Sequence, residues 1–375
     1  MKEFNKYVGL DVHKDTIAVS IADKGRGQSR YFGEIVNKPQ EVDKLVKRLS
    51  PNGEVTSFCY EAGACGYSIY RQITKMGHEC EVVAPSLIPK KSGDRIKNDR
   101  RDSDGLARLH RAGELTAVWV PDQDQEAIRD LVRCRDDIKQ MEKKARQLVN
   151  AFVLRHGHRY TKPTKWTQAH WRWLEKIKID HPQQKVVLQE YIDAVQHSSA
   201  RVKELEAEMA KALEYWSLAP VVEGLMAMRG IDLVSAMGLI AELGDLTRFA
   251  RPTQLMAYLG LVPSAYDSGQ TQRRGGITKA GNSHARRILV ESAWSYQFPA
   301  RKSRRIQRRA EKCEEAIQAI AWKGQLRLCG RYRSLINRSM MKVKAITAVA
   351  REMCGFIWAI ANEVMRKLRP TIVEA

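Results

Sequence analysis

The sequence has few cysteines, no long apolar run and fewer acidic than basic residues, and each shortage excludes a class of protein. Its seven cysteines form no CxxC pair, so we expect reduced thiols rather than a disulfide framework or a zinc knuckle. The first residues lack the apolar segment of a secretory signal, and the longest nearly apolar stretch, residues 354–361, is too short to span a bilayer. We therefore expect a cytoplasmic protein with no membrane partner.

The charge balance is strongly basic. There are 64 Lys and Arg residues against 43 Asp and Glu residues, which gives a formal net charge of +21. This excess makes a polyanion such as nucleic acid the expected partner. The alternative is an ordinary cytosolic protein that is merely basic. The 375 residues, of which 43% are hydrophobic, are enough for two or three packed units.

Residues 1–122 alternate β-rich and helical patterns, which is typical of an α/β domain. Strands are expected at Tyr7–Val12, Thr16–Ala22, Val55–Tyr60, Glu81–Ala84 and Ala117–Val120. Helices are expected at Gln40–Leu49, Tyr67–Met76 and Asp99–Ala112.

Residues 123–217 carry two long apolar seams at helical spacing. The first seam runs through Ile128, Leu131, Ile138, Met141, Ala145, Leu148 and Phe152. The second seam runs through Val187, Tyr191, Val195, Val202, Leu205, Met209 and Leu213. The two seams predict an antiparallel coiled-coil hairpin, which either pairs with another subunit or is a plain two-helix spacer.

Residues 218–375 are predicted to form an all-helical unit that is interrupted by one polar loop. This loop, residues 262–283, is too polar for a core and too long for a tight turn, and loops of this kind commonly carry function. Further along, residues 301–344 contain 14 Lys and Arg residues and three Glu residues. We expect this basic stretch to bind nucleic acid.

Four acidic residues are candidates for a metal site. Asp11 and Glu61 each end an expected strand, and Asp99 and Asp102 lie three residues apart on one helix face. Ligand sites in α/β sheets gather at strand ends, where four carboxylates would repel one another. Mg²⁺ or Mn²⁺ would relieve the repulsion and could clamp a phosphodiester. The alternative is that each acid caps a turn or pairs with a neighbouring arginine.

Ser268 is the candidate nucleophile of the polar loop. It precedes a glycine, and no acid interrupts the cations between residues 268 and 290. These residues alone favour a phosphate-binding loop in which Ser268 only donates a hydrogen bond, over a nucleophilic serine. The candidate nucleic-acid contacts are Arg273, Arg274, Lys279, Arg286 and Arg287 beside the loop, and Arg304, Arg305, Arg308 and Arg309 in the basic stretch.

These motifs resemble the DEDD-type transposases of insertion sequences, which pair a RuvC-like domain with a serine-bearing transposase domain and are relatives of the Piv DNA invertases. The resemblance extends in family order over nearly the whole chain. It rests on YVGLDVHKD, CYEAGACG, KNDRRDSDGLARLHRAGELTAVWVP, GDLTRFARPTQLMAYLGLVPSAYDSG, RRGGITKAGNSHARRILVESAW, AWKGQLRLCGRYRSL and VAREMCGFIWAI.

The resemblance implies a role for each candidate residue. It makes Asp11, Glu61, Asp99 and Asp102 a RuvC-like (RNase H-like) tetrad that binds Mg²⁺ or Mn²⁺. It also makes Ser268 the nucleophile that joins DNA covalently, with Ser264 as the next candidate. Many relatives carry a second serine directly before the nucleophile, where this chain has Asp267.

The resemblance further implies partners and an arrangement of domains. It suggests a non-coding bridge RNA that pairs with donor and target double-stranded DNA, and a homodimer or homotetramer in a prokaryotic, nucleoid-associated setting. The expected division is a RuvC-like α/β domain (1–122), a coiled-coil helical hairpin (123–217) and a mainly α-helical transposase domain (218–375). Two other functions stay open on the residues alone: a metal-dependent junction nuclease in which Ser268 only binds phosphate, and a non-catalytic basic scaffold.

Overall fold

The chain divides into two compact units, Met1–Val120 and Pro121–Ala375. The structure is a computed structural model, and it describes residues 4–89, 98–268 and 271–368. Within these ranges, no helix combines the length and the apolar character that a membrane crossing needs. The proposed separation of residues 123–217 from 218–375 stays a prediction, because both segments belong to the second unit.

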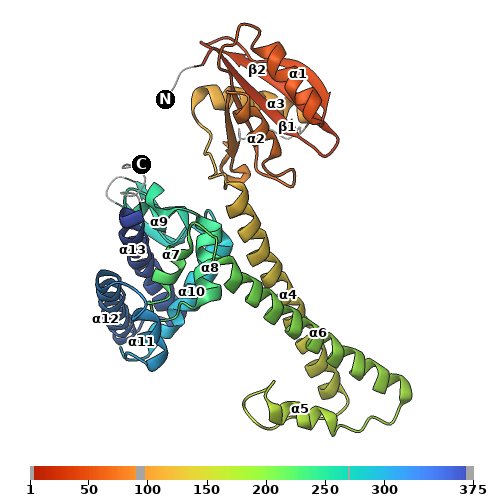
Figure 1. The fold of residues 1–375 in the computed structure, drawn as a ribbon, viewed down its shortest axis with the longest axis vertical. Helices are drawn as coiled ribbons and strands as arrows, with labels where there is room; N and C mark the ends of the chain where they lie inside the picture. Colours follow the sequence, from red (N-terminus) through yellow and green to blue (C-terminus); the bar gives the residue numbers. More distant parts are fainter. Residues whose placement is uncertain (1–3, 90–97, 269–270, 369–375) are drawn as a thin grey trace. The chain divides into compact units, whose positions relative to one another are not determined.

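The first unit is built on a mixed five-stranded sheet with the order β3-β2-β1-β4-β5 (Figure 1). Its strands are β1 (Lys6–Val12), β2 (Thr16–Asp23), β3 (Arg30–Val36), β4 (Ser57–Glu61) and β5 (Glu79–Val83). Strand β2 is antiparallel to both of its neighbours, β1 and β3. Strand β4 pairs parallel with β1, and β5 pairs parallel with β4. Strand β3 was not expected. The strand expected at residues 117–120 was wrong, because only Ala117 forms a bridge, to Val83.

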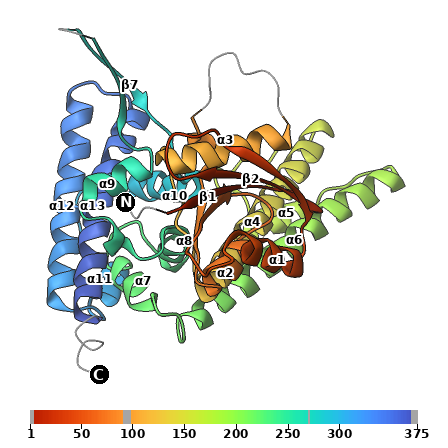
Figure 2. The same cartoon turned by 90° about the horizontal axis from the view of Figure 1, so that it is seen from above.

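Helices cover both faces of this sheet. Helices α1 (Pro39–Leu49) and α2 (Ser68–Lys75) lie on one face, and α3 (Asp99–Ala112) lies on the other (Figure 2). A short 3₁₀ turn, η1 (Pro85–Leu87), follows β5. Side chains alternate between the two faces of a strand, so Val8 and Leu10 join the core beneath α1 and α2. Gly9 and Asp11 therefore belong to the face that α3 covers. The α/β prediction for this part of the chain is confirmed.

The second unit begins with two long helices that pack along each other, α4 (Gln123–Arg155) and α6 (Pro182–Ala212), joined through α5 (Gln168–Glu175) (Figure 1). Apolar side chains of both long helices share one core near α5, including Phe152 and Val195. The predicted seam is only partly followed, since Met141 is 56% exposed and Glu142 is buried in its place. Whether the pair is a coiled coil stays a prediction.

The rest of the second unit is mainly helical. Its α-helices are α7 (Ala219–Leu225), α8 (Leu233–Leu243), α9 (Pro252–Tyr258), α10 (Ser283–Ala293), α11 (Arg304–Ala310), α12 (Glu315–Asn337) and α13 (Lys342–Leu368). The 3₁₀ turns are η2 (Leu246–Arg248) and η3 (Trp294–Gln297). The apolar helix α8 and the long helix α13 contribute to the shared core. Helix α4 is anchored to the end of α8, because the Gln125 side chain donates hydrogen bonds to the carbonyls of Ile240 and Ala241.

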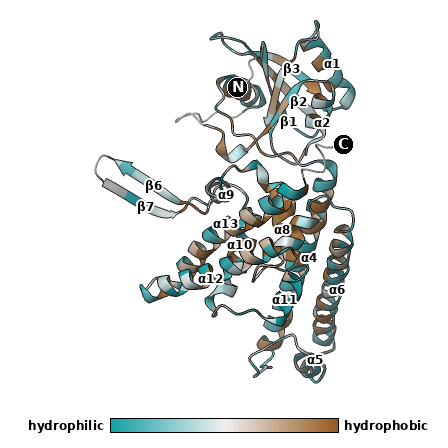
Figure 3. Ribbon diagram, turned by 60° about the vertical axis from the view of Figure 1, so that its left-hand side comes forward, coloured by the Kyte–Doolittle hydropathy of each residue, from teal (hydrophilic) through white to brown (hydrophobic). Residues whose placement is uncertain are grey.

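The prediction of a polar loop at residues 262–283 was wrong in part, because the segment contains two strands. The prediction of an all-helical unit was wrong here for the same reason. Strands β6 (Pro263–Ser268) and β7 (Thr271–Ile277) pair antiparallel there. Figure 3 shows the two strands extending away from the helices of their unit. A strand pair that is exposed to solvent on both faces needs no alternation of apolar and polar residues. Its sequence pattern is therefore typical of a loop.

Candidate active site

The ends of β1 and β4 bring two candidate acids to one edge of the sheet. The strands are parallel neighbours, and Leu10 lies opposite Tyr60 in their register. Asp11 and Glu61 are the next residues on the two strands. The period-two alternation places both on the face of the sheet that carries Gly9 and Cys59. Cys59 shares a small core with Leu106 of α3, so both acids belong to the α3 side.

Helix α3 brings the other two acids to the sheet because it packs directly on the β1 backbone. A Cβ atom added at Gly9 would overlap the carbonyl oxygen of Ser103 and the amide nitrogen of Ala107. The buried Ser103 hydroxyl also hydrogen-bonds Ser20 Oγ of β2, at 2.9 Å. The Asn98 side chain caps the start of α3. Asp99 and Asp102 therefore occupy the first turn, where the helix dipole favours negative charge.

Three side chains offer ligand atoms at this point. Among the described residues, oxygens of Asp11 and Asp99 and a ring nitrogen of His13 lie within 4.8 Å of one another. His13 Nε2 is 3.3 Å from Asp11 Oδ2 and 3.5 Å from Asp99 Oδ1. Asp11 Oδ2 is buried and has no hydrogen-bond partner in the described structure. Burial raises the pKa of Asp11, His13 opposes the rise, and the nearby charges of Asp102 and Asp99 add to it.

These observations fit a divalent cation. A buried carboxylate oxygen that makes no hydrogen bond, with His13 at 3.3 Å and two further carboxylates nearby, is an arrangement that a bound cation would stabilise. The structure groups Asp11 and Asp99, and Asp102 is near enough to act on the charge of Asp11. Glu61 stands exposed at the neighbouring strand end, outside that ligand group. His13 was missed by the sequence reasoning, although it lies two residues after Asp11 in the same motif.

Ser268 lies at the exposed end of β6, opposite Thr271 of β7. Arg274 of β7 is 3.4 Å from Asp267, which neutralises part of its charge, and Arg273 is exposed. Ser264, the second candidate, faces Gly275, where an added Cβ atom would overlap the serine hydroxyl. The ribbon therefore presents Ser268 to solvent beside cations.

The other predicted cations fall into two groups. Some are exposed, namely Lys279, Arg304, Arg305 and Arg308. Others bond within the protein. Arg286 donates to the carbonyls of Leu259 and Ala280, Arg309 donates to the carbonyl of Ile231, and Arg287 pairs with Asp136 and Glu291. The internally bonded arginines contribute to the fold as well as to the charge of the surface.

A half-buried ionic network at the start of α10 was not visible in the sequence. His284, at the start of α10, contacts Asp136 of α4 through Nε2 at 2.6 Å and Glu242 of α8 through Nδ1 at 3.1 Å. Glu242 also accepts hydrogen bonds from Arg133 and Asn282. The hydrogen bonds to the two carboxylates raise the pKa of His284 to about 9. Burial disfavours the charge of Glu242, yet its donors outweigh that cost and hold its pKa well below the usual range.

The network bears on whether His284 could act as a general base for Ser268. His284 is close to Ser268 in the sequence and would be the natural general base. A histidine that is protonated at neutral pH, with both ring nitrogens engaged, is unsuited to take a proton from a serine. His284 instead ties the start of α10 to α4 and α8.

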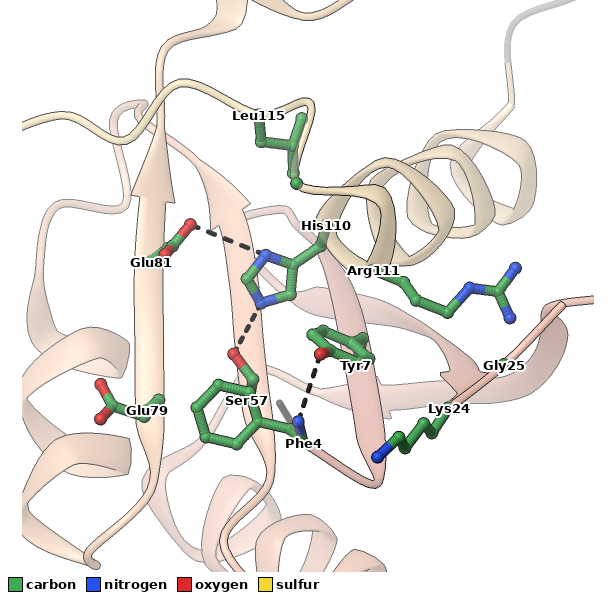
Figure 4. A pocket seen from close by; sticks show the side chains of 11 residues that line it. Phe4, Tyr7, Lys24, Gly25, Ser57, Glu79, Glu81, His110, Arg111 and Leu115 are labelled. Atoms are coloured by element: carbon green, nitrogen blue, oxygen red, sulfur yellow. Dashed lines mark hydrogen bonds and ion pairs between the residues drawn. The ribbon is translucent and has the colours of Figure 1, made fainter. Parts of the chain in front are cut away.

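A separate cavity of about 820 Å³ opens in the first unit (Figure 4). Its walls include Tyr7, Ser57 and Glu79 from the opening residues of β1, β4 and β5, whereas Asp11 and Glu61 stand at strand ends. His110 Nε2 is 2.7 Å from Ser57 Oγ, and burial lowers the pKa of His110 to about 4. Ser57 is 2% exposed, so this pair stabilises the strand starts rather than forming an accessible nucleophile.

Comparisons with known proteins cover both units. Residues 8–157 match a family model named for the DEDD transposases of IS110, with the description "Transposase". Residues 222–309 match the model described as "Transposase IS116/IS110/IS902 family".

Individual relatives extend the likeness to nearly the whole chain. A Sinorhizobium fredii protein named "Putative transposase y4qE" is 48% identical over 95% of this chain and 88% of its own length. The transposase for insertion sequence element IS1533 of Leptospira borgpetersenii is 29% identical over 88% of this chain and 96% of its own. The transposase for insertion sequence element IS1111A of Coxiella burnetii is 23% identical over 77% of each chain.

An acidic cluster on a mixed sheet, together with this likeness, defines the class of the protein: it is a DNA transposase. More narrowly, the chain belongs to the IS116/IS110/IS902 family of insertion-sequence transposases. DEDD transposases typically use divalent metal ions.

Proposed function

We propose that this transposase cuts and rejoins DNA at specific sites through a covalent link between Ser268 and a DNA phosphate. The observation that carries the proposal is the exposed position of Ser268 on a cationic ribbon, in a chain whose other unit gathers carboxylates around a buried, unpartnered oxygen. A divalent cation held by Asp11, Asp99, Asp102 and Glu61 would polarise a phosphodiester and stabilise a leaving oxygen.

The chain's own residues account for the remaining steps. The Ser268 oxygen forms a bond to phosphorus and loses its proton, while one phosphorus–oxygen bond of the DNA breaks and the departing oxygen takes up a proton. Arg273, which lies opposite Tyr266 and so two residues along the ribbon from Ser268, would hold the charged phosphate. The phosphoserine ester retains the energy of the broken bond, so attack by a new DNA hydroxyl rejoins the strand without a nucleotide cofactor.

Denaturing gels with labelled junction DNA test this chemistry. Wild-type protein should give a protein–DNA adduct, and Ser268→Ala should give none. Ser264→Ala, on the same ribbon, is the matched control and should keep the adduct. Cleaved DNA without an adduct would instead support the junction nuclease, and intact DNA would support the scaffold. An adduct that persists in Ser268→Ala and disappears in Ser264→Ala would move the nucleophile to Ser264.

We also propose a guide RNA and a homodimer or homotetramer, with α4 and α6 at the subunit contact. The apolar side chains of Met141 and Val186 support this contact, since they are 56% and 61% exposed on these helices. Leu131 packs on the core of the second unit, so a charge at Met141 tests assembly more cleanly. Met141→Lys should shift sedimentation toward monomer, whereas Lys143→Ala should not.

The guide RNA requires a different measurement. RNA that copurifies with the full-length protein should match a non-coding segment of the element, with complementarity to both DNA junctions. Sequencing that returns only unrelated cellular RNA would remove the guide from the proposal and leave the serine chemistry untouched.

A further inference from the structure

The turn between α4 and α6 contains a small cavity that the proposed recombination chemistry does not use. We call residues 156–181 the hairpin tip. The cavity, of about 200 Å³, is formed by the end of α4, the following turn and α5. Tyr160 and Trp173 supply aromatic surface, Arg159 and Lys165 supply positive charge, and Asn150 supplies an amide.

One polar atom in the wall of this cavity lacks a partner. Within the described residues, the Tyr160 hydroxyl is buried without a hydrogen bond. Both ring nitrogens of His170, which does not line the cavity but packs against Tyr160 and Trp173, also lack one. His170 is fully buried. Its ring stacks on Trp173 at 5.4 Å and meets Tyr160 edge-on at 4.6 Å. Burial, assisted by Lys165, lowers the pKa of His170. Buried donors and acceptors without partners cost free energy, and a bound polar group can recover it.

The backbone of the tip is also held in a costly conformation. Trp166 has φ of 65°, in the left-handed region that bulky residues rarely adopt. Arg146 of α4 lies over its ring, 5.1 Å from the centroid. Strained residues persist where the surroundings hold them, and they gather at ligand clamps. The strain and the unpartnered atoms are independent signs that this turn serves more than a connection.

The charge of the tip identifies the kind of ligand. Residues 156–181 contain six Lys and Arg residues and two acids, Glu175 and Asp180. All six cations are exposed: Arg159, Lys162, Lys165, Arg172, Lys176 and Lys178. A second copy of the tip would carry the same charge and be repelled. A polyanion would be attracted, and its aromatic groups could enter the cavity.

We propose that the hairpin tip binds an unstacked nucleotide of a single-stranded or looped nucleic acid. The base enters the cavity against Trp173, and the Tyr160 hydroxyl faces its polar edge. The Asn150 side chain, which donates to the carbonyl of Arg146 and accepts from Lys165, fixes the wall beside it. Arg159 and Lys165 hold the adjacent phosphate outside. A paired base in a duplex presents no free face, so single strands are preferred. The inference needs only that the transposase acts on nucleic acid, and it does not depend on the serine chemistry.

Photocrosslinking with the full-length protein tests the site. The probes are short bromouracil-substituted strands, supplied as single-stranded RNA, single-stranded DNA and the corresponding DNA duplex. Peptide mapping should place crosslinks from single strands at Tyr160 or Trp173. The RNA and DNA arms then distinguish which nucleic acid the tip takes. No crosslink in the tip while other parts of the protein are crosslinked, or equal crosslinking by the duplex, would overturn the proposal.

Matched variants distinguish binding in the cavity from attraction by the overall positive charge of the protein. Arg159→Ala with Lys165→Ala should weaken crosslinking at the tip about tenfold or more, because two charge-assisted hydrogen bonds to the phosphate are lost. The control, Lys143→Ala with Lys144→Ala, removes the same charge from an exposed stretch of α4 and should leave crosslinking at the tip unchanged. An equal loss in the control would mean that only net charge acts. Trp173→Leu gives a second test, with circular dichroism to confirm that the hairpin remains folded.

Discussion

The acidic cluster and the serine ribbon differ in how firmly the protein holds them. The acids stand on a sheet whose strands are clamped between helices, and α3 touches the β1 backbone at Gly9. Ser268 stands at the end of a two-stranded ribbon with its side chain in solvent. The first unit therefore holds its carboxylates together before any ligand binds, whereas the proposed nucleophile on the ribbon would be positioned only when DNA binds.

This contrast implies that the two sites differ in how much they lower the stability of the folded protein. Carboxylates brought together in advance destabilise the unit that holds them until a cation binds. An exposed serine has almost no effect on the stability of the folded protein. Changes at the acids should therefore alter activity and stability together, and changes at the ribbon should alter activity alone.

The largest effect is expected from Asp11→Asn. Recombination should fall by about a thousandfold or more, because the amide cannot replace an anionic metal ligand whose contribution is several kcal/mol. Without added metal, however, the variant should be more stable than wild type, since burial and the nearby acids disfavour the charged form of Asp11. Thermal melts should show that Mg²⁺ raises the Tm of wild type but not of the variant. Ser268→Ala should leave both the Tm and its metal response unchanged. If Ser268→Ala also alters them, the comparison between the two sites is wrong.

The next effect concerns the packing of α3 on β1. Gly9→Ala should lower the free energy of unfolding of the first unit by about 3 kcal/mol, because the added methyl overlaps backbone atoms of α3. Gly105→Ala is the control on α3, where nothing lies within 4 Å of the added Cβ. It should stabilise the unit by about 0.5–1 kcal/mol through helix propensity. Urea melts of both variants distinguish these outcomes, and similar values for the two would show that α3 is not tightly seated.

The half-buried network predicts a pH dependence for the second unit. The pKa of His284 is about 9 in the folded protein, above its unfolded value of about 6.5. Its stabilising contribution is thus fully present below about pH 6.5 and is lost as the pH rises through about 9, on the order of 3 kcal/mol in all. The Tm should fall over this window. His284→Ala should remove much of that slope, and the exposed His197→Ala should keep it. A Tm that stays flat from pH 6.5 to 9 in wild type would contradict the network.

The smallest effect is expected from the exposed cations of α11. Removing Arg304, Arg305 and Arg308 together should reduce the slope of log K against log salt on duplex DNA by about 0.9 for each lost phosphate contact. Arg309 is kept in this experiment because it bonds to Ile231. An unchanged slope would show that these three arginines form only a solvated helix face.

The sequence predicted local structure better than the way distant residues meet. The helix at Asp99–Ala112 was predicted from the spacing of Leu106 and Leu109 with its observed bounds, and the structure shows an Asn98 cap at its start and Gly113 at its end. Strand β3 was missed, since this edge strand is only partly buried along its length and its register follows from pairing with β2. The β6–β7 ribbon was missed because both of its faces are polar.

The same limit applies to the candidate site. Asp11, Asp99 and Asp102 could be nominated from strand ends and helical spacing. The convergence of His13 with Asp11 and Asp99 depends on how α3 docks. The network around His284 joins residues from α4, α8 and α10, and no local pattern connects them. Chemistry that rests on long-range contacts becomes visible only in the fold.

The close approach at Gly9 also bears on the order in which the protein is made. Asp11 leaves the ribosome early, whereas Asp99 and Asp102 belong to the last helix of the first unit. Until α3 is complete and seated on β1, the growing chain holds these carboxylates apart. A nascent chain therefore lacks the grouping of Asp11 with Asp99 until almost the whole first unit has been synthesised, and shorter fragments lack the proposed cation site.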